Sequence, residues 1–193
     1  MSSFEFFTVL LSFVVSIGVA HLLQTVAQLI QEHDRVRFSL TWALWAGAIF
    51  NLQVTFWLRS WVYHEQFTLR TETSVPPLVL AIIAFLTCGL VAPRVRETGE
   101  IDLRVFHEED GRKYQIAYAA FMLVAIVQGI LMADIASEEL PANKLLTDSL
   151  VQAMFAVMAI LAAVFHRVRW LQVGVPALFI AFALGFYHRM MDP

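Results

Sequence analysis

The stretch from residue 38 to residue 63 constrains the fold of this chain more than any other part of the sequence. Its letters, FSLTWALWAGAIFNLQVTFWLRSWVY, include a single formal charge, Arg59. A helix rises about 1.5 Å per residue, so this stretch is long enough to cross a hydrocarbon core of about 30 Å with some tilt. Trp42 and Trp61 would lie about 28 Å apart, as aromatic residues do at the two lipid–water boundaries. The stretch therefore predicts a transmembrane helix.

Composition extends this prediction to the whole chain of 193 residues. Hydrophobic residues make up 59% and the mean hydropathy is +0.68, whereas soluble domains are usually about 45–50% apolar. Charged residues make up 15% and the net charge is -3, which gives no basis for nucleic-acid binding. These values indicate an integral membrane protein whose first partner is the lipid bilayer.

Apolar segments of spanning length recur along the sequence. We expect six spans, at about residues 4–30, 38–63, 75–92, 114–133, 148–165 and 170–187. Pro76 and Pro77 suit the first turn of the third span. The polar stretch 94–113 is expected to be a surface loop, either solvated or with a short strand-like or helical part. The fold class predicted is an all-α membrane protein, with residues 1–193 forming one bundle of six transmembrane helices joined by short loops.

The basic residues predict the orientation of the bundle. Nine lie after the first, third and fifth spans, at Arg35, Arg37, Arg94, Arg96, Arg104, Arg112, Lys113, Arg167 and Arg169. Four lie on the opposite side, at Arg59, Arg70, Lys144 and Arg189. Because short cytoplasmic loops carry the excess of Lys and Arg, both termini are expected outside the cytoplasm.

The second span separates into two faces at about 100° per residue. Small and polar residues, including Gly47, Ala48 and Asn51, lie on the face expected to contact other helices. The opposite face is expected to contact lipid and carries Trp42, Gln53, Trp57 and Trp61. Gln53 does not fit this assignment because an amide in hydrocarbon is costly. It could bond a neighbouring subunit, or the helix could be rotated from this assignment. The interpretation we favour is an amide satisfied by hydrogen bonds within the bundle.

Polar residues of the first two spans suggest a candidate site. His21, Gln24 and Gln28 share one face of the first span, and an antiparallel hairpin would bring them near Asn51 and Thr55 of the second. Ionisable residues inside a membrane are functional candidates, and histidine titrates nearest to neutral pH. Two interpretations remain open for this intramembrane cluster. It is a pathway or sensing element, or its members make the hydrogen bonds that ordinarily join helices in membranes.

A second pair of residues lies near the outer ends of the spans. Arg59 and Asp134 are expected at similar depth, where they form an ion pair or anchor separately in the headgroup region.

Several kinds of chemistry lack a motif in this sequence. No Asp or Glu lies in the middle of a span, which argues against a proton-coupled carrier. No HExxH or GxSxG motif occurs, and the single cysteine, Cys88, allows neither an intramolecular disulfide nor a cysteine-based metal site. We therefore expect no catalytic residues, cofactor or metal ion, and no enzyme activity. Cys88 is expected to be a small buried side chain.

Two functions are compatible with these features. The first is a channel or carrier for an ion or small solute that uses the polar face of the first two helices, with a homo-oligomer completing the pore. The alternative is a non-catalytic scaffold or accessory subunit that binds a membrane protein partner. The expected location is the bacterial inner (plasma) membrane.

Overall fold

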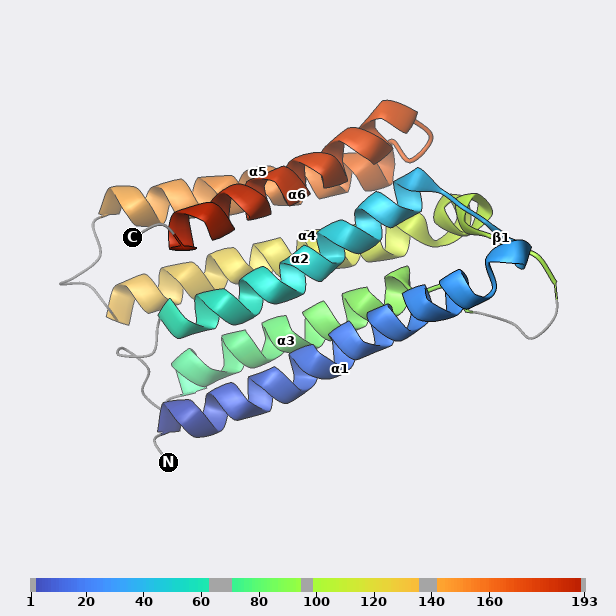
Figure 1. Cartoon of the computed structure of the whole chain (residues 1–193). Helices are drawn as coiled ribbons and strands as arrows, with labels where there is room; N and C mark the ends of the chain where they lie inside the picture. Colours follow the sequence, from blue (N-terminus) through green and yellow to red (C-terminus); the bar gives the residue numbers. More distant parts are fainter. Residues whose placement is uncertain (1–2, 63–70, 95–98, 136–141, 192–193) are drawn as a thin grey trace.

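The computed structural model describes residues 3–62, 71–94, 99–135 and 142–191. Within them, six long helices lie side by side along a common direction (Figure 1). They are α1 (Ser3–Gln31), α2 (Leu40–Val62), α3 (Thr71–Val91), α4 (Leu103–Ile135), α5 (Ala142–Val164) and α6 (Arg169–Met191). Both termini lie at one end of the bundle, and the strand β1 (Val36–Arg37) lies at the other (Figure 1).

Each predicted span corresponds to one of these helices, so the predicted helical membrane fold is confirmed. The largest differences are at helix starts, because α3 begins at Thr71, α4 at Leu103 and α5 at Ala142. Pro76 and Pro77 consequently lie inside α3 rather than in its first turn.

Within the described ranges, four helices are long and apolar enough to cross a membrane by themselves. These segments are Glu5–Gln31, Ser74–Val91, Leu103–Leu131 and Leu146–Val164, while the apolar part of α6, Arg169–Gly185, is shorter. The described part of α2 does not meet this criterion, although its sequence was the strongest indication of a span. The reason is its central position, since α2 contacts α1, α3, α4 and α6. Its side chains meet protein on several sides and need not be as apolar as side chains that face lipid.

The central position of α2 also corrects its predicted faces. Trp42 was expected to face lipid, but it is buried. Gln53 is buried too, as expected for an amide satisfied within the bundle rather than facing lipid. The indole Nε1 of Trp42 donates to the carbonyl oxygen of Val91 at 2.9 Å. The amide Nε2 of Gln53 donates to the carbonyl oxygen of Ala84 at 2.5 Å and lies 3.2 Å from Sγ of Cys88. A helix that is surrounded by others buries both of its faces, so a two-face division could not orient it.

Trp57 does lie at the protein surface, where its Nε1 donates to Oγ of Ser12 at 3.0 Å. The side chain of Trp61 lies outside the described residues. Cys88 is fully buried, as predicted.

A regular row of buried residues seats α1 against the bundle, most extensively against α3. The spacing alternates between three and four residues, as in a coiled-coil seam. The row consists of Thr8, Leu11, Val15, Gly18, Leu22, Thr25 and Leu29. At Gly18 the two helices approach closely, because a Cβ built there would lie 3.4 Å from Cα of Phe85. Phe7 is buried as well, and Val14, Val19 and Val26 flank the row and pack against the core.

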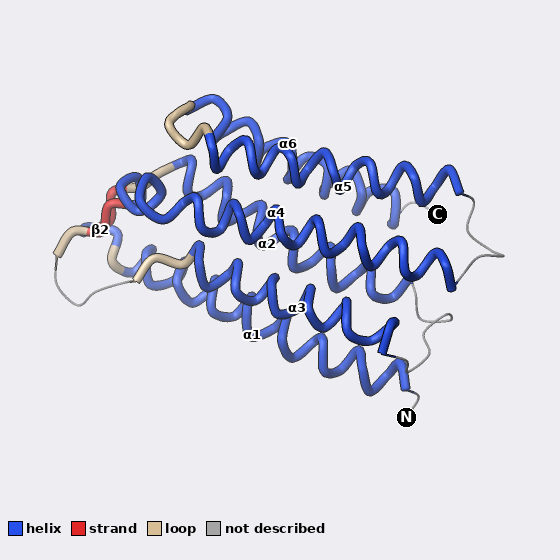
Figure 2. Tube along the Cα trace, turned by 180° about the vertical axis from the view of Figure 1, so that it is seen from behind, coloured by secondary structure: helices blue, strands red, loops and turns tan. Residues whose placement is uncertain are grey.

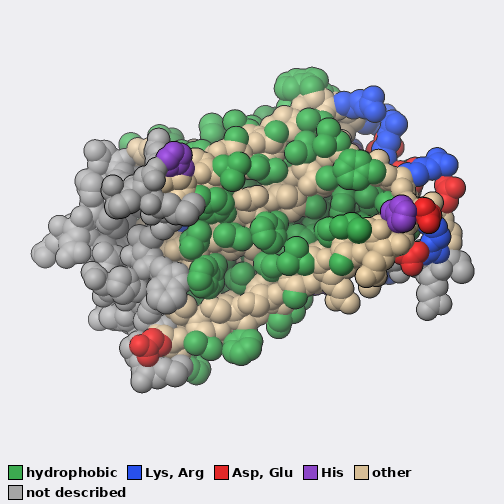
Figure 3. Space-filling view, in the orientation of Figure 1, with side chains coloured by type: hydrophobic (Ala, Val, Ile, Leu, Met, Phe, Trp, Pro, Cys, Tyr) green, Lys and Arg blue, Asp and Glu red, His purple; other side chains and the backbone are tan. Residues whose placement is uncertain are grey.

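The end of the bundle opposite the termini contains the short polar elements. A 3-10 turn (His33–Arg35) precedes β1, which pairs in parallel with β2 (Ile101–Asp102; Figure 2). Asp102 then caps α4, since its Oδ1 accepts from the backbone N–H groups of Arg104 and Val105 at 2.9 and 3.1 Å. The described part of stretch 94–113 is therefore a strand and the first turns of a helix. Charged side chains gather at this end, whereas hydrophobic ones cover the middle of the visible face (Figure 3).

Candidate functional site

A cavity of about 160 Å³ lies between the helices, and all six contribute to its wall. The polar end of the cavity lies toward the side of the bundle where both termini are found (Figure 1). It is formed by Thr8, Arg59, Ser60, Asp148 and Ser149. Its other end is formed by aromatic side chains deeper in the bundle. The cavity thus has a polar end, which can form hydrogen bonds and ion pairs, and an apolar end, which cannot.

An ion pair defines the polar end. Nη2 of Arg59 on α2 lies 3.0 Å from Oδ2 of Asp148 on α5, and the two side chains are 34% and 47% exposed. Among the described lining residues, Arg59 is the single cation and Asp148 the single carboxylate. Gln128, Gln152 and Oγ1 of Thr8 add hydrogen-bonding groups nearby, and Oγ1 of Thr8 has no partner in the described chain. This end can therefore contact a small polar or charged solute.

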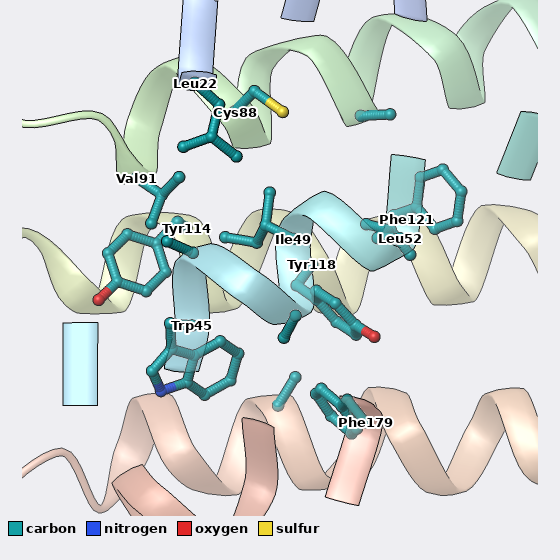
Figure 4. Close-up of a cluster of buried hydrophobic side chains, with 14 of the residues drawn as sticks. Leu22, Trp45, Ile49, Leu52, Cys88, Val91, Tyr114, Tyr118, Phe121 and Phe179 are labelled. Carbon is teal, nitrogen blue, oxygen red and sulfur yellow. The ribbon is translucent and has the colours of Figure 1, made fainter. Parts of the chain in front are cut away.

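Stacked aromatic rings close the inner end. The rings of Tyr118 on α4 and Phe179 on α6 are parallel, with centroids 4.7 Å apart, and Phe155 lies 4.8 Å from Phe179. Behind them Trp45 meets both rings edge-on, at 6.2 Å from Tyr118 and 6.0 Å from Phe179. Figure 4 shows the hydroxyl of Tyr118 pointing away from Trp45. These rings form a floor that separates the cavity from the core around Trp45.

The structure brings together two of the five residues predicted for the intramembrane cluster. Asn51 and Thr55 both line the cavity. Nδ2 of Asn51 donates to the carbonyl oxygen of Gly47 at 2.8 Å, and Oγ1 of Thr55 lies 3.0 Å from the hydroxyl of Tyr187. That hydroxyl is also 3.3 Å from the carbonyl oxygen of Asn51. Tyr187 was not anticipated as a partner, because it lies on α6, far away in sequence.

His21, Gln24 and Gln28 lie elsewhere, exposed on α1. The expected hairpin between α1 and α2 placed them beside Asn51, but the α1 seam faces mainly α3 and turns these three side chains outward. The five residues therefore do not form one cluster within a single chain.

The predicted pairing of Arg59 with Asp134 involves a side chain outside the described residues, so it remains a prediction. The partner that the structure gives to Arg59 is Asp148. Because α5 begins at Ala142, Asp148 lies within the helix, and its side chain reaches the cavity.

A second polar cluster, which the sequence reasoning missed, lies at the opposite end of the bundle. Nε2 of His107 is 3.1 Å from Oε1 of Gln172, which also accepts from Nε2 of Gln115 at 2.6 Å. Nδ1 of His107 hydrogen-bonds the hydroxyl of Tyr114. These four side chains are buried. His107, Gly111 and Tyr114 have the i, i+4, i+7 spacing of one helix face, a signal that the assumption of a loop at 94–113 concealed.

His166 completes this second cluster from the turn between α5 and α6. Its Nε2 donates to the carbonyl oxygen of His107 at 2.8 Å, and burial lowers the pKa of its imidazole. Among the described residues, no group of three His, Cys, Asp or Glu side chains is arranged to hold a metal ion. The hydrogen bonds of the cluster join α4 to α6 and to the turn between α5 and α6.

A helical bundle that encloses a cavity with a cation at one end and an aromatic floor at the other has the form of a membrane channel or carrier. Residues 3–187 match the SLAC1 family, described as voltage-dependent anion channel. The chain belongs to this family. No curated protein and no solved structure shows a significant match to it.

Family membership decides between the two functions considered from the sequence. The protein is a multi-pass integral membrane protein that serves as a channel or carrier for a small solute, as the first of the two predicted. The family is one of channels rather than enzymes.

Proposed function

We propose that the cavity is part of an anion pathway, with Arg59 as the residue that attracts the ion and the rings of Tyr118 and Phe179 as the barrier to its passage. The observation that carries this proposal is the position of Arg59, the one cation among the described lining residues, beside hydroxyl and amide donors at the polar end. Donors of this kind replace part of the hydration shell of an anion.

The ion pair supports reversible binding at this position. Asp148 neutralises Arg59 when no anion is present, but both side chains are partly exposed. Exposed ion pairs contribute only about 0–1 kcal/mol, so an entering anion can compete with the carboxylate for the guanidinium. Conduction requires binding that is favourable enough to admit an ion and weak enough to release it.

The dimensions of the cavity are compatible with this role. A water molecule occupies roughly 30 Å³ in the liquid, and the cavity of about 160 Å³ exceeds that several-fold. It has room for a small anion with part of its hydration shell. Asn51 and Thr55 lie along the wall between the polar end and the aromatic floor, and they act here as lining residues.

The test is chloride flux in liposomes that contain the purified protein. We expect Arg59→Gln to reduce the initial flux several-fold, and Arg59→Lys to retain most of it because the charge remains. Asp148→Asn should increase the flux, since Arg59 loses its competitor. The matched control is Arg104→Gln, which removes an exposed arginine paired with Glu108 at the opposite end of the bundle. Equal flux in wild type and Arg59→Gln, or no anion flux under any gradient, would contradict the proposal.

The orientation and location complete the proposal. With both termini outside the cytoplasm, the end that holds Arg59 faces the exterior, and the bacterial inner membrane remains the expected location. We expect the protein to act without enzymatic turnover.

A further inference from the structure

One side of α1 combines polar side chains with a position at membrane depth. We define the α1 outer face as the exposed residues Ile17, Ala20, His21, Gln24, Ala27, Gln28 and Gln31. They lie on the side of the helix away from the seam with α3. They belong to the segment Glu5–Gln31, which is long and apolar enough to span the bilayer.

His21 and Gln24 lie within the hydrocarbon region. The middle of that segment is residue 18, so the two residues are about 4.5 and 9 Å from the midplane of a core with a half-thickness of about 15 Å. In the described part of the chain, the side chains of His21, Gln24 and Gln28 make no hydrogen bond. Polar groups without partners are costly in hydrocarbon, so these side chains require a partner from outside the chain.

The spacing on the α1 outer face fits a parallel pair of helices. Ile17, Gln24 and Gln31 are spaced seven residues apart. Ala20 follows Ile17 by three residues, and Ala27 follows Gln24 by three residues. This is the pattern of a coiled-coil seam, and the small alanines allow two helix backbones to approach closely.

Symmetry identifies a suitable partner. Copies of one chain insert in the membrane with the same orientation, so they are related by a rotation axis along the membrane normal, which keeps equal residues at equal depth. Where the α1 outer face lies next to that axis, each of its residues meets the same residue of the next copy. A glutamine amide both donates and accepts, so two Gln24 side chains can satisfy one another. The α1 outer face is thus complementary to itself.

We propose that the α1 outer face is an interface between copies of this chain, with the Gln24 amides hydrogen-bonded across it and His21 and Gln28 at its edge. This assigns a role to three of the residues that sequence reasoning had placed in one intramembrane cluster. The proposal does not depend on the anion pathway, because residues of a single chain line the cavity.

Disulfide cross-linking in native membranes tests the interface. In a Cys88→Ala background, Ala20→Cys places one thiol on the face and leaves Gln24 intact. Oxidation should give a product of about twice the 21.9 kDa chain mass, because same-residue pairs across a parallel seam lie within the 4.4–6.8 Å Cα separation of disulfides. The control is Val157→Cys, which is exposed near the middle of α5 on the far side of the bundle (Figure 1).

A second measurement follows the role of the amide. Loss of one interhelical hydrogen bond should raise the dissociation constant of the assembly in detergent by roughly three- to tenfold in Gln24→Leu. Chloride flux per folded chain should stay at the wild-type level, which separates this test from that of the anion pathway.

Three results would overturn the proposal. They are cross-linking of Ala20→Cys no stronger than that of Val157→Cys, cross-linking to a different protein, and an unchanged dissociation constant in Gln24→Leu.

Discussion

Nε2 of His166 donates a hydrogen bond across 2.8 Å to the carbonyl oxygen of His107, and the two imidazole rings lie 4.9 Å apart, inclined by 33°. Through this contact the turn between α5 and α6 is fixed to the first part of α4. Because a carbonyl only accepts, Nε2 of His166 carries the proton, and Nδ1 has no partner in the described chain. The imidazole of His166, a titratable group outside the cavity, thus takes part in a contact between two elements of the bundle.

The stability of the protein should fall in mild acid. Burial lowers the pKa of His166 below its usual value of about 6.5, so the unfolded chain binds a proton more readily than the folded one. The contribution of the neutral imidazole is complete above that value and is lost as the pH falls below it. The apparent Tm in detergent should therefore decrease between pH 7.5 and pH 5, and His166→Asn should show a smaller decrease. A pH profile that is identical in the two proteins would argue against this.

Gly111 of α4 should not tolerate a methyl group. A Cβ built at this position would lie 2.6 Å from Cε1 of His166 and 3.1 Å from Nδ1 of His107. Gly111→Ala forces both rings to move, and overpacking of this kind costs about 1–3 kcal/mol in unfolding free energy. Denaturation in mixed detergent measures the difference. Gly89→Ala on α3, where no atom lies within 4 Å, is the control and should be neutral or slightly stabilising.

The indole of Trp42 should stabilise the end of α3. Val91 is the last residue of this helix, so its buried carbonyl has no partner within the helix and depends on Nε1 of Trp42. Trp42→Phe leaves that oxygen unsatisfied, at an expected cost of about 1–3 kcal/mol. Trp170→Phe, at a residue 73% exposed, should change the unfolding free energy by less than about 0.5 kcal/mol. Equal effects in the two variants would refute this role.

Removing a ring from the floor of the cavity should increase anion flux. Phe179→Ala deletes the ring that contacts Tyr118, Phe155 and Trp45, and so opens the floor. We expect a several-fold higher chloride flux per folded channel in liposomes. Since Phe→Ala in a core costs about 3–5 kcal/mol, Phe179→Leu serves as a milder variant with a smaller increase. Leu178→Ala alters the exposed neighbour and should leave the flux unchanged.

Much of the fold could be predicted from hydropathy, but the rotation of each helix could not. The length of the apolar segments placed all six helices, and the isolated Cys88 was correctly expected to be buried. Trp42 was assigned to the wrong surroundings, because a helix packed on several sides has no single polar face for a sequence pattern to reveal. His107 was missed for a different reason, since a charged stretch was taken for a loop but begins a helix with one buried face.

The sequence by itself determined that this chain is a bundle of membrane helices, because long apolar segments have few other stable solutions in lipid. It also supplied the polar residues from which any site had to be built. Only the tertiary structure decided their grouping: Asn51 and Thr55 line a cavity with Arg59 and Asp148, while His21 and Gln24 face outward. The physical reason is that neighbouring spans need not pack face to face. The row from Thr8 to Leu29 packs α1 mainly against α3. Which helix α1 packs against depends on contacts between residues far apart in the chain.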